Sequence, residues 1–216
     1  MKITVFGATG GVGREVVRQA LAAGHEVTAV VRDPARLEVP PQERLRLAVA
    51  QDLTDESALL PVLAGQDAVV SALGAAGNKQ ARLRPVTGPA LRSVVAAMER
   101  AGVARLAAVS AAPLGPHAEG DGLLLRKVGY PLLKWALRDV YADLAVMEAA
   151  IAASGLRWTV VRPPRLLNRP GTGHYRRALD ANVPAGRVIA RADVATALLD
   201  TLSDPTTAGH AVGVAA

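Results

Sequence analysis

Gly7-Ala8-Thr9-Gly10-Gly11-Val12-Gly13 stands between residues 2–6, which are mostly apolar or β-branched, and a segment from Arg14 whose apolar residues recur at helical spacing. These patterns predict a strand, a glycine turn and a helix in succession, the context in which a glycine motif is informative. The first glycine permits a tight bend, the middle pair lets a pyrophosphate lie against the backbone, and the last lets the helix pack on the strand. N–H groups at the helix start favour an anion. The stretch therefore predicts a dinucleotide-phosphate loop, with a glycine-rich turn that binds nothing as the alternative.

The rest of the chain continues this alternation of strands and helices. Further strands are predicted over residues 26–31, 45–50, 67–73, 103–110 and 158–162, and helices over 55–64, 88–101, 141–154 and from Asp193, as the cap, through Leu202. Such alternation predicts an α/β fold with a doubly wound parallel sheet and helices on both faces. Right-handed crossovers favour the strand order 3-2-1-4-5-6, with residues 211–214 as a possible short edge strand.

The length and the prolines set the predicted domain organisation. A chain of 216 residues is expected to form a single domain over residues 1–216. Residues 111–138, with three prolines, are predicted to be irregular and to form a small substrate-side lobe together with residues 163–190. In a sheet of this order the ligand is expected at the switch point between the first and fourth strands, over the glycine turn and Leu73–Gly74.

Composition excludes several classes of protein. The chain has no Cys, and its 25 Lys or Arg against 19 Asp or Glu give a formal net charge of +6. The absence of Cys excludes disulfides and thiolate zinc sites, and no metal site is expected. The basic residues are scattered and aromatics are few, which argues against nucleic acid as a partner. With no signal peptide and no apolar run of membrane-spanning length, we expect a cytoplasmic monomer or homodimer whose partner is a small molecule, with no membrane partner.

Five motifs together resemble the atypical short-chain dehydrogenase/reductase superfamily. They are GATGGVG at 7–13, VVRDPARL at 30–37, VSALG at 70–74, SGLRWTVVRPPRL at 154–166 and the weaker RADVA at 191–195. The chain is most similar to NmrA-like members and to the small biliverdin reductase B/flavin reductase group. The resemblance implies a Rossmann fold, NADP(H) binding and, in many members, redox chemistry.

The expected cofactor contacts run along the carboxyl ends of the predicted strands. They are Gly7, Thr9, Gly10, Gly11, Val12, Gly13, Arg32, Asp52, Leu53, Ala72, Leu73, Gly74, Ser110, Arg162, Pro163 and Pro164. The pair Asp52-Leu53 is assigned beside the adenine by the resemblance, although Asp52 could equally cap the following turn.

The residue after the second strand selects the cofactor. An arginine there pairs with a 2′-phosphate, whereas an acidic residue accepts hydrogen bonds from a ribose 2′-hydroxyl. Arg32 is the first residue past this strand and Asp33 follows it. We expect NADP(H) to be preferred to NAD(H), with Pro34 favouring an extended Asp33 that turns its carboxylate aside. The alternatives are that Arg32 is a solvated loop residue, and that Asp33 holds the ribose of NAD(H).

Ser110 and Tyr141 are the predicted catalytic residues. The resemblance places a serine at the end of the fifth strand and a tyrosine followed, four residues later, by lysine. Ser110 and Tyr141 hold the first two positions, but Ala145 stands where the lysine is expected. A tyrosine without this lysine keeps a pKa near ~10 and is a poor acid–base group at neutral pH. Tyr130 and Lys134 also have the tyrosine-to-lysine spacing, which we interpret as coincidence because they lie too far upstream.

Three functions remain open on the sequence. The first is an NAD(P)H-dependent oxidoreductase that transfers hydride to a planar conjugated or carbonyl compound, such as a flavin, quinone, tetrapyrrole or biosynthetic ketone. The biliverdin reductase B-like group also lacks the tyrosine–lysine pair, which favours this interpretation. The second is an NmrA-like redox sensor that binds NADP(H) without turnover, and the third is an epimerase or tailoring enzyme. An apolar cluster that includes residues 123–125, Tyr130, Leu132, Leu133 and Trp135 is expected either to line the substrate site or to pack on the sheet.

Overall fold

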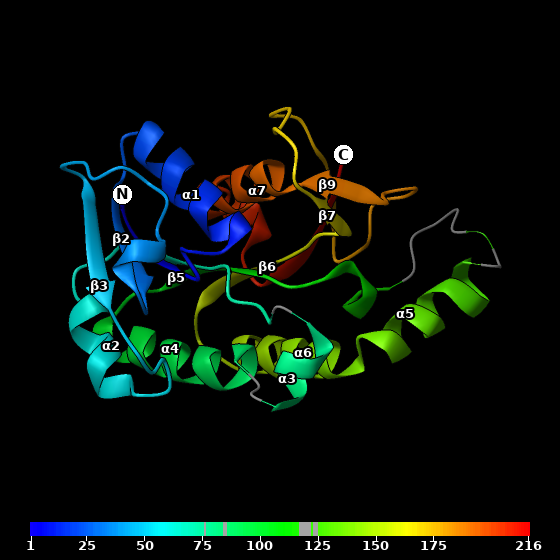
Figure 1. Ribbon diagram of the computed structural model, residues 1–216, viewed down its shortest axis with the longest axis horizontal. Helices are drawn as coiled ribbons and strands as arrows, with labels where there is room; N and C mark the ends of the chain where they lie inside the picture. Colours follow the sequence, from blue (N-terminus) through cyan, green and yellow to red (C-terminus); the bar gives the residue numbers. More distant parts are fainter. Residues whose placement is uncertain (76, 84–85, 117–121, 123–124) are drawn as a thin grey trace.

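An eight-stranded sheet organises the chain in a computed structural model that describes residues 1–75, 77–83, 86–116, 122 and 125–216 (Figure 1). The strand order is β3-β2-β1-β4-β5-β6-β10-β8. The strands are β1 (Lys2–Phe6), β2 (Glu26–Val31), β3 (Leu45–Val49), β4 (Ala68–Ser71), β5 (Arg105–Val109), β6 (Arg157–Arg162), β8 (Arg176–Leu179) and β10 (His210–Ala215). Only the β10–β8 pair is antiparallel within this sheet. The predicted order of the first six strands is confirmed.

Helices cover both faces of the sheet, as predicted (Figure 1). On one face lie α1 (Gly11–Ala22) and α7 (Arg191–Ser203). The opposite face carries α2 (Glu56–Leu63), α3 (Asn78–Leu83), α4 (Thr87–Ala101) and α6 (Arg138–Ala152), and α5 (Tyr130–Ala136) extends from the end of this layer. The carboxyl ends of β1, β4 and β5 therefore meet between two helical layers.

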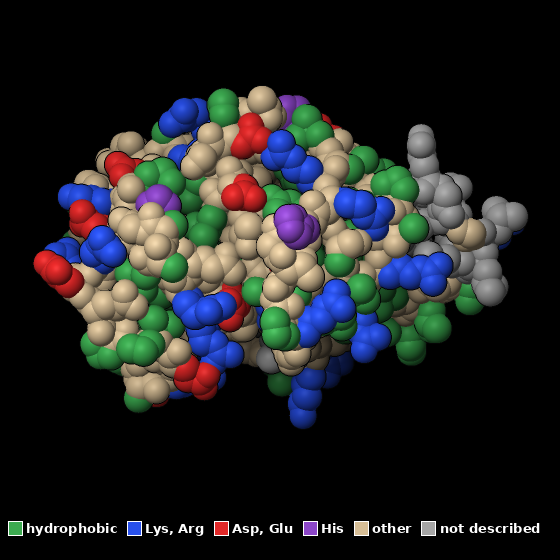
Figure 2. Space-filling view, turned by 90° about the horizontal axis from the view of Figure 1, so that it is seen from above, with side chains coloured by type: hydrophobic (Ala, Val, Ile, Leu, Met, Phe, Trp, Pro, Cys, Tyr) green, Lys and Arg blue, Asp and Glu red, His purple; other side chains and the backbone are tan. Residues whose placement is uncertain are grey.

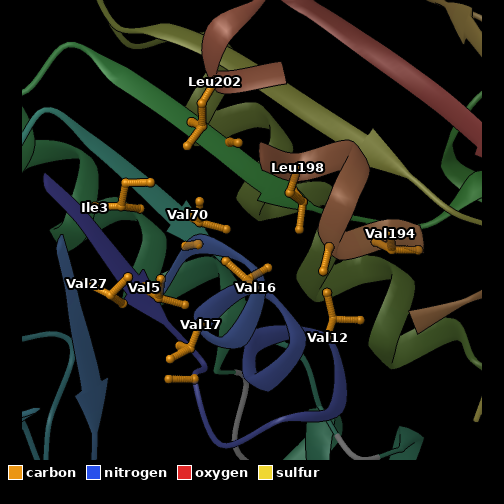
Figure 3. Packing of buried hydrophobic residues seen from close by; sticks show 14 of the residues in the cluster. Ile3, Val5, Val12, Val16, Val17, Val27, Val70, Val194, Leu198 and Leu202 are labelled. Atoms are coloured by element: carbon orange, nitrogen blue, oxygen red, sulfur yellow. The ribbon is translucent and has the colours of Figure 1, made fainter. Parts of the chain in front are cut away.

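The alternation of side chains along each strand divides the core into two clusters. Val5 packs with Val16 and Leu198 between the sheet and the α1–α7 layer, as Figure 3 shows. Phe6, the next residue, points to the other face and packs with Leu91 and other residues of the α4 layer. Because both faces are buried, β1, β2 and β4 are almost continuously apolar, as expected for central parallel strands.

A second, two-stranded sheet sets the position of α7. The strands β7 (Arg165–Leu167) and β9 (Val188–Ala190) pair in parallel, with Leu166 opposite Ile189. This pair closes the segment that follows β6, and α7 begins directly after β9. The sequence did not predict these two strands, which are three residues long.

Two predictions at the C-terminal end are wrong. The strand predicted at the edge is β10, which lies inside the sheet between β6 and β8. The predicted helix cap, Asp193, lies within the first turn of α7, which starts at Arg191 after Ala190. Asp193 is buried, and its Oδ1 accepts hydrogen bonds from the backbone N–H groups of Thr172 and Gly173 at 2.9 and 3.0 Å. It therefore anchors the preceding loop.

Residues 111–138 contain more regular structure than predicted. A 3-10 turn covers Ala112–Leu114, a π-helical turn covers Leu125–Gly129, and Pro131 lies in the first turn of α5. The helix predicted from residue 141 starts at Arg138. Leu132 and Trp135 are 60% and 68% exposed, so these side chains of the expected apolar cluster do not pack on the sheet. Residues 123 and 124 lie outside the described residues.

The described residues lack two features that would change the interpretation of the site. None of their helices combines the length and the apolar character needed to cross a bilayer. They also hold no group of three or more His, Cys, Asp or Glu side chains that could bind a metal ion.

Candidate functional site

The glycine turn joins β1 to α1 through two close backbone approaches. Gly7 has a φ of +74°, and a Cβ on it would lie 2.6 Å from the carbonyl oxygen of Ala72. A Cβ on Gly13 would overlap the carbonyl oxygen of Gly7. Any side chain at either position would push apart β1, α1 and the segment after β4. The roles predicted for these two glycines, the tight bend and the close helix packing, match this geometry.

The two middle glycines face different surroundings. A Cβ on Gly10 would approach only the Gly7 carbonyl oxygen, at 3.2 Å, and Gly10 is exposed at the N-cap of α1. This side of the turn can therefore take an anion against the start of the helix. A Cβ on Gly11 would instead lie 2.6 Å from Cδ and 2.9 Å from Nε of Arg191. The space above Gly11 thus holds an arginine side chain, which the sequence did not predict.

Thr9 and Val12 complete the predicted phosphate loop. Thr9 is half-buried, whereas the Val12 side chain is buried in the core between α1 and α7. Val12 can therefore offer only backbone atoms to a ligand. Together with Gly10 and the start of α1, this arrangement fits the diphosphate of a dinucleotide.

Two charged residues follow β2: Arg32, which is exposed, and Asp33, whose carboxylate caps a turn of its own. Arg32 is exposed, and its carbonyl oxygen accepts a hydrogen bond from Gln51 Nε2 at 2.8 Å. Asp33 has an extended backbone, with φ −135° and ψ 110°. Its Oδ1 accepts a hydrogen bond from the Ala35 N–H at 3.0 Å and caps a 3-10 turn over Pro34–Arg36. The extended backbone expected for Asp33 before Pro34 is confirmed. The Asp33 carboxylate is engaged in capping the 3-10 turn that follows it.

The end of β3 leads into a capped turn. Asp52 Oδ1 accepts hydrogen bonds from Thr54 N and Oγ1 at 2.8 and 2.7 Å, the geometry of the turn-capping alternative. Leu53 is half-buried against the core beneath α4. Contact of this pair with the adenine stays a prediction.

The segment after β4 lies directly opposite the glycine turn. The Ala72 N–H donates to the Phe6 carbonyl oxygen at 2.9 Å, so the chain continues beside β1 past the end of β4. Leu73 packs against the core beneath α4, and Gly74 is exposed with no atom within 4 Å of its Cβ position. This segment therefore forms an open border of the candidate site next to Gly7.

Ser110 lies just past the end of β5, where the N–H of its backbone donates to the Val161 carbonyl oxygen at 2.8 Å. The residue is 6% exposed, and its Oγ has no hydrogen-bond partner among the described residues. A buried hydroxyl without a partner costs roughly 1–3 kcal/mol, so an unpaired one inside a folded protein calls for an explanation, and a bound ligand is one such explanation. This observation distinguishes Ser110 from a strand-end serine bonded to local backbone, the ordinary alternative.

Tyr141 lies on α6 and packs against the same core cluster as Leu73, Ala111 and Leu114. Tyr141 and the segment that follows Ser110 therefore lie on the same side of the sheet. Burial raises the pKa of the Tyr141 phenol above its ordinary value of 10.0. The side chain at the expected lysine position, Ala145, is exposed and carries no charge. Tyr141 is therefore protonated at neutral pH and unassisted by a neighbouring ammonium.

Arg162 forms an ion pair that the sequence did not indicate. Its Nε and Nη2 donate to the two carboxylate oxygens of Glu148, on α6, at 3.1 and 2.6 Å. Both side chains are largely buried, at 17% and 16% exposed. This bidentate pair ties the end of β6 to α6. The charge of Arg162 is therefore matched within the protein, and contact of this residue with the cofactor stays a prediction.

The prolines after Arg162 border Ser110. The buried Pro163 accepts a hydrogen bond from the Ala112 N–H through its carbonyl oxygen, at 2.9 Å, and Pro164 is half-buried. Asn182, also buried, donates through Nδ2 to the carbonyl oxygens of Ala112 and Pro116 at 2.9 and 2.7 Å. The two segments expected to form the small lobe are therefore joined beside Ser110. None of the five sequence motifs contains Asn182.

A groove of about 740 Å³ lies at the other end of α1 and α7, lined by residues that include Gln19, His25 and Asp200. Tyr175 also lines this groove. Its hydroxyl donates to Asp200 Oδ2 at 2.8 Å. The groove lies toward the C-terminal ends of α1 and α7, away from the glycine turn at which α1 begins.

Charges of both signs occur on the α1–α7 face (Figure 2). Lys and Arg side chains are more numerous toward the end of the molecule where β7 and β9 lie. Two arginines of β8 have partners within the protein: Arg176 donates to the carbonyl oxygens of Pro184 and Ala216, and Arg177 pairs with Asp204 at 2.7 Å. These two arginines therefore stabilise the β8 region of the fold.

Comparisons with known proteins agree with the glycine turn and the sheet order. The profile of an NAD(P)H-binding family matches residues 7–205. The chain is 30% identical over 213 residues to the uncharacterized protein YwnB of Bacillus subtilis (strain 168), a match that covers 95% of this chain and 93% of YwnB. It is 35% identical over 188 residues to the 3-diazoavenalumate denitrifying reductase of a Streptomyces species, covering 82% of this chain and 59% of that protein.

The fold also matches solved structures. A short-chain dehydrogenase/reductase from Veillonella parvula DSM 2008, solved in complex with NADP, has a TM-score of 0.78 at 20% sequence identity, covering 100% of this chain and 94% of that chain. At that identity the likeness shows the fold alone. The family profile spans most of the chain, and the glycine turn stands at the carboxyl end of β1 as such a fold requires. The chain therefore belongs to the NAD(P)H-binding family and has a Rossmann fold.

Proposed function

We propose that the protein is an NADPH-dependent reductase that transfers hydride to a planar conjugated or carbonyl small molecule, such as a flavin, quinone, tetrapyrrole or ketone. Membership of the NAD(P)H-binding family supports the cofactor class. The match to a Streptomyces reductase supports the reaction class. The acceptor itself is proposed from the geometry around Ser110.

The buried, unpaired hydroxyl of Ser110 is the observation that carries this proposal. It lies at the carboxyl end of β5, two strands from the glycine turn, where the nicotinamide end of a dinucleotide lies in folds of this type. A carbonyl oxygen or a ring nitrogen of an acceptor would satisfy the Ser110 hydroxyl. Such a hydrogen bond orients the acceptor and stabilises the negative charge that develops as it is reduced.

In this proposal the residues of the chain bind the cofactor and position the acceptor. When bound, the dinucleotide supplies the hydride from its nicotinamide ring. The glycine turn and the start of α1 bind the diphosphate, and Leu73 and Gly74 border the nicotinamide end. Tyr141 positions the acceptor, because its phenol is not tuned as an acid. The proton that completes the reduction comes from solvent, so one hydride and one proton are added to the acceptor.

Preference for NADP(H) is the finer part of the proposal. Arg32 is exposed at the end of β2, where its guanidinium can grip two oxygens of a 2′-phosphate. Asp33 caps its own 3-10 turn and so does not oppose the phosphate from the ribose side. Arg14, the other nearby cation at the start of α1, already pairs with Glu38. The proposed selectivity therefore depends on Arg32.

The test is NADPH oxidation at 340 nm against a panel of flavins, quinones and aromatic ketones. We expect turnover with at least one acceptor, and a Ser110→Ala variant that is roughly ten- to a hundredfold slower through loss of one orienting donor. Ser71→Ala is the matched control, because the Ser71 hydroxyl is equally buried and unpaired but lies within β4. Equal rates for Ser110→Ala and the control would remove Ser110 from the proposed site.

A redox sensor is the second candidate function. The uncharged Ala145 at the expected lysine position favours it, because Tyr141 then has no partner that would make it an acid–base group. A sensor would bind NADPH tightly and oxidise it with none of the acceptors. That result would overturn the reductase proposal and leave the cofactor proposal intact.

A further inference from the structure

Arg191 is the first residue of α7, and its side chain lies across the first residue of α1. A Cβ on Gly11 would come within 2.6 Å of Cδ, 2.9 Å of Nε and 3.9 Å of Cζ of Arg191. The arginine stem therefore occupies the space that a side chain at position 11 would need. The motif RADVA, in which Arg191 stands, thus meets the motif GATGGVG in space, although 180 positions separate them in the sequence.

The charge of Arg191 is not matched by a carboxylate in the described part of the chain. Its Nη1 donates to the neutral Oδ1 of Asn168. Asp193, two residues further along α7, turns its Oδ1 to the N–H groups of Thr172 and Gly173. By contrast, Arg14, in the first turn of α1, pairs with Glu38. Arg191 is thus the cation beside the glycine turn whose charge stays available for an anion.

The position of Arg191 is determined by the elements around the start of α7. The β7–β9 pair fixes the start of α7, and Asn168 follows β7 by one residue. The side chain of Gln19, on α1, donates to the Ala192 carbonyl oxygen at 2.9 Å, which ties the beginning of α7 to α1. Arg191 is therefore held from both sides: by the contact between the two helices and by the amide of Asn168.

We propose that Arg191 binds the pyrophosphate of the dinucleotide, and that Gly11 lacks a side chain in order to admit this arginine. The proposal rests on the proposed cofactor binding and deepens it. In it, Gly10 and the start of α1 contact the diphosphate from one side, and the guanidinium contacts it from α7. A guanidinium suits this task because its planar fork can bind two phosphate oxygens at once.

The position of Arg191 predicts a different selectivity from that of Arg32. The pyrophosphate is common to NADPH, NADH and ADP, whereas the 2′-phosphate belongs to NADPH alone. Loss of the Arg191 charge should therefore weaken all three ligands by a similar factor, roughly ten- to a hundredfold for one charge-assisted contact. Loss of Arg32 should weaken NADPH and leave NADH and ADP nearly unchanged.

The experiment compares dissociation constants of NADPH, NADH and ADP for the wild type, Arg191→Gln, Arg191→Lys and Arg32→Ala. Arg187→Gln is the matched control, since it removes an exposed arginine just before β9. Binding by calorimetry is measured at several salt concentrations, because a phosphate contact makes affinity fall with ionic strength. We expect a shallower salt dependence for Arg191→Gln, and partial recovery of affinity for Arg191→Lys.

A structural role for Arg191 predicts other results. If it only packs on Gly11, Arg191→Gln would lower the melting temperature while the salt dependence stayed that of the wild type. Wild-type affinity for ADP in a folded Arg191→Gln variant would likewise overturn the inference while leaving NADPH binding in place. A wild type that binds neither NADPH nor NADH would instead overturn the proposed function.

A second variant tests the same contact with the arginine retained. Asn168→Asp places a carboxylate where Arg191 now finds a neutral oxygen, so the guanidinium gains an internal partner that competes with the ligand. We expect weaker ADP binding by Asn168→Asp than by Asn168→Ala, which removes the hydrogen bond to Arg191 without adding a competing charge. Tighter ADP binding by Asn168→Asp would contradict the proposal.

Discussion

At the scale of single residues, the pKa of Tyr141 determines whether its phenol can exchange a proton in the candidate site. Burial raises the pKa of Tyr141 above 10.0, so the folded protein holds the phenolic proton more tightly than the unfolded chain does. Any stability that this shift contributes is present below pH 10 and is lost as the pH rises through the raised pKa. Tyr141 therefore does not ionise over the range in which activity would be measured.

We expect Tyr141→Phe to lower kcat less than tenfold, since the phenol orients the acceptor without donating a proton. Between about pH 6 and 9, the profile of kcat should have the same shape in the variant and in the wild type. The measurement is kcat against pH for both proteins, with circular dichroism to check the fold. A folded but inactive variant, or an alkaline limb that disappears with the hydroxyl, would show that Tyr141 is the proton donor.

Elements of the sheet and its covering layer are joined by one buried cation. Arg105, the first residue of β5, is 6% exposed, and burial lowers the pKa of its guanidinium. It donates to the carbonyl oxygens of Thr201 and Leu202 at the end of α7, and to Thr159 Oγ1 at 2.8 Å. Carbonyls of the last helical turn lack partners within the helix, and a cation there is also favoured by the helix dipole.

Arg105→Met should therefore lower the free energy of unfolding by about 3 kcal/mol, because it removes several buried hydrogen bonds, including the one to the Leu202 carbonyl oxygen. Urea denaturation measures this loss. Arg157→Met is the control, since Arg157 lies opposite Arg105 in the β5–β6 register but is exposed, and its loss should cost less than about 0.5 kcal/mol. Equal losses in the two variants would show that the buried contacts of Arg105 contribute nothing specific.

At the same scale, sequence patterns located most elements but not all of their ends. The apolar strands and the helices between them were predictable because their periodicity is local. The start of α7 could not be predicted, because Asp193 looks like a helix cap in the sequence. Only the folded structure shows that its carboxylate accepts a hydrogen bond from the Thr172 N–H in the preceding loop. The internal position of β10 depends on its pairing with β8, which carries no alternating apolar pattern.

For the whole molecule, the sequence predicted the fold and the approach of the segment after β4 to the glycine turn. The glycine spacing and the strand alternation are sufficient for this, since both follow from backbone geometry. What it could not predict are contacts between side chains distant in the chain. Arg191 over Gly11, Glu148 with Arg162 and Asn182 beside Ala112 are of this kind. The residue types alone did not distinguish these from ordinary surface groups.

The central claim is that a nicotinamide dinucleotide binds against the glycine turn, and titration of Gly10→Val with NADPH tests it most directly. Gly10 has φ −77° and ψ 163°, which valine adopts, and a Cβ there would approach only the Gly7 carbonyl oxygen, at 3.2 Å, so the fold should survive with a small local shift. Its side chain would fill the space proposed for the diphosphate. Gly155→Val is the control, because a Cβ there meets nothing nearer than Glu99 Oε1, at 3.9 Å. We predict that wild type and Gly155→Val bind NADPH equally and that Gly10→Val, with an unchanged circular dichroism spectrum, shows no saturable binding. Wild-type affinity in a folded Gly10→Val protein would contradict the account.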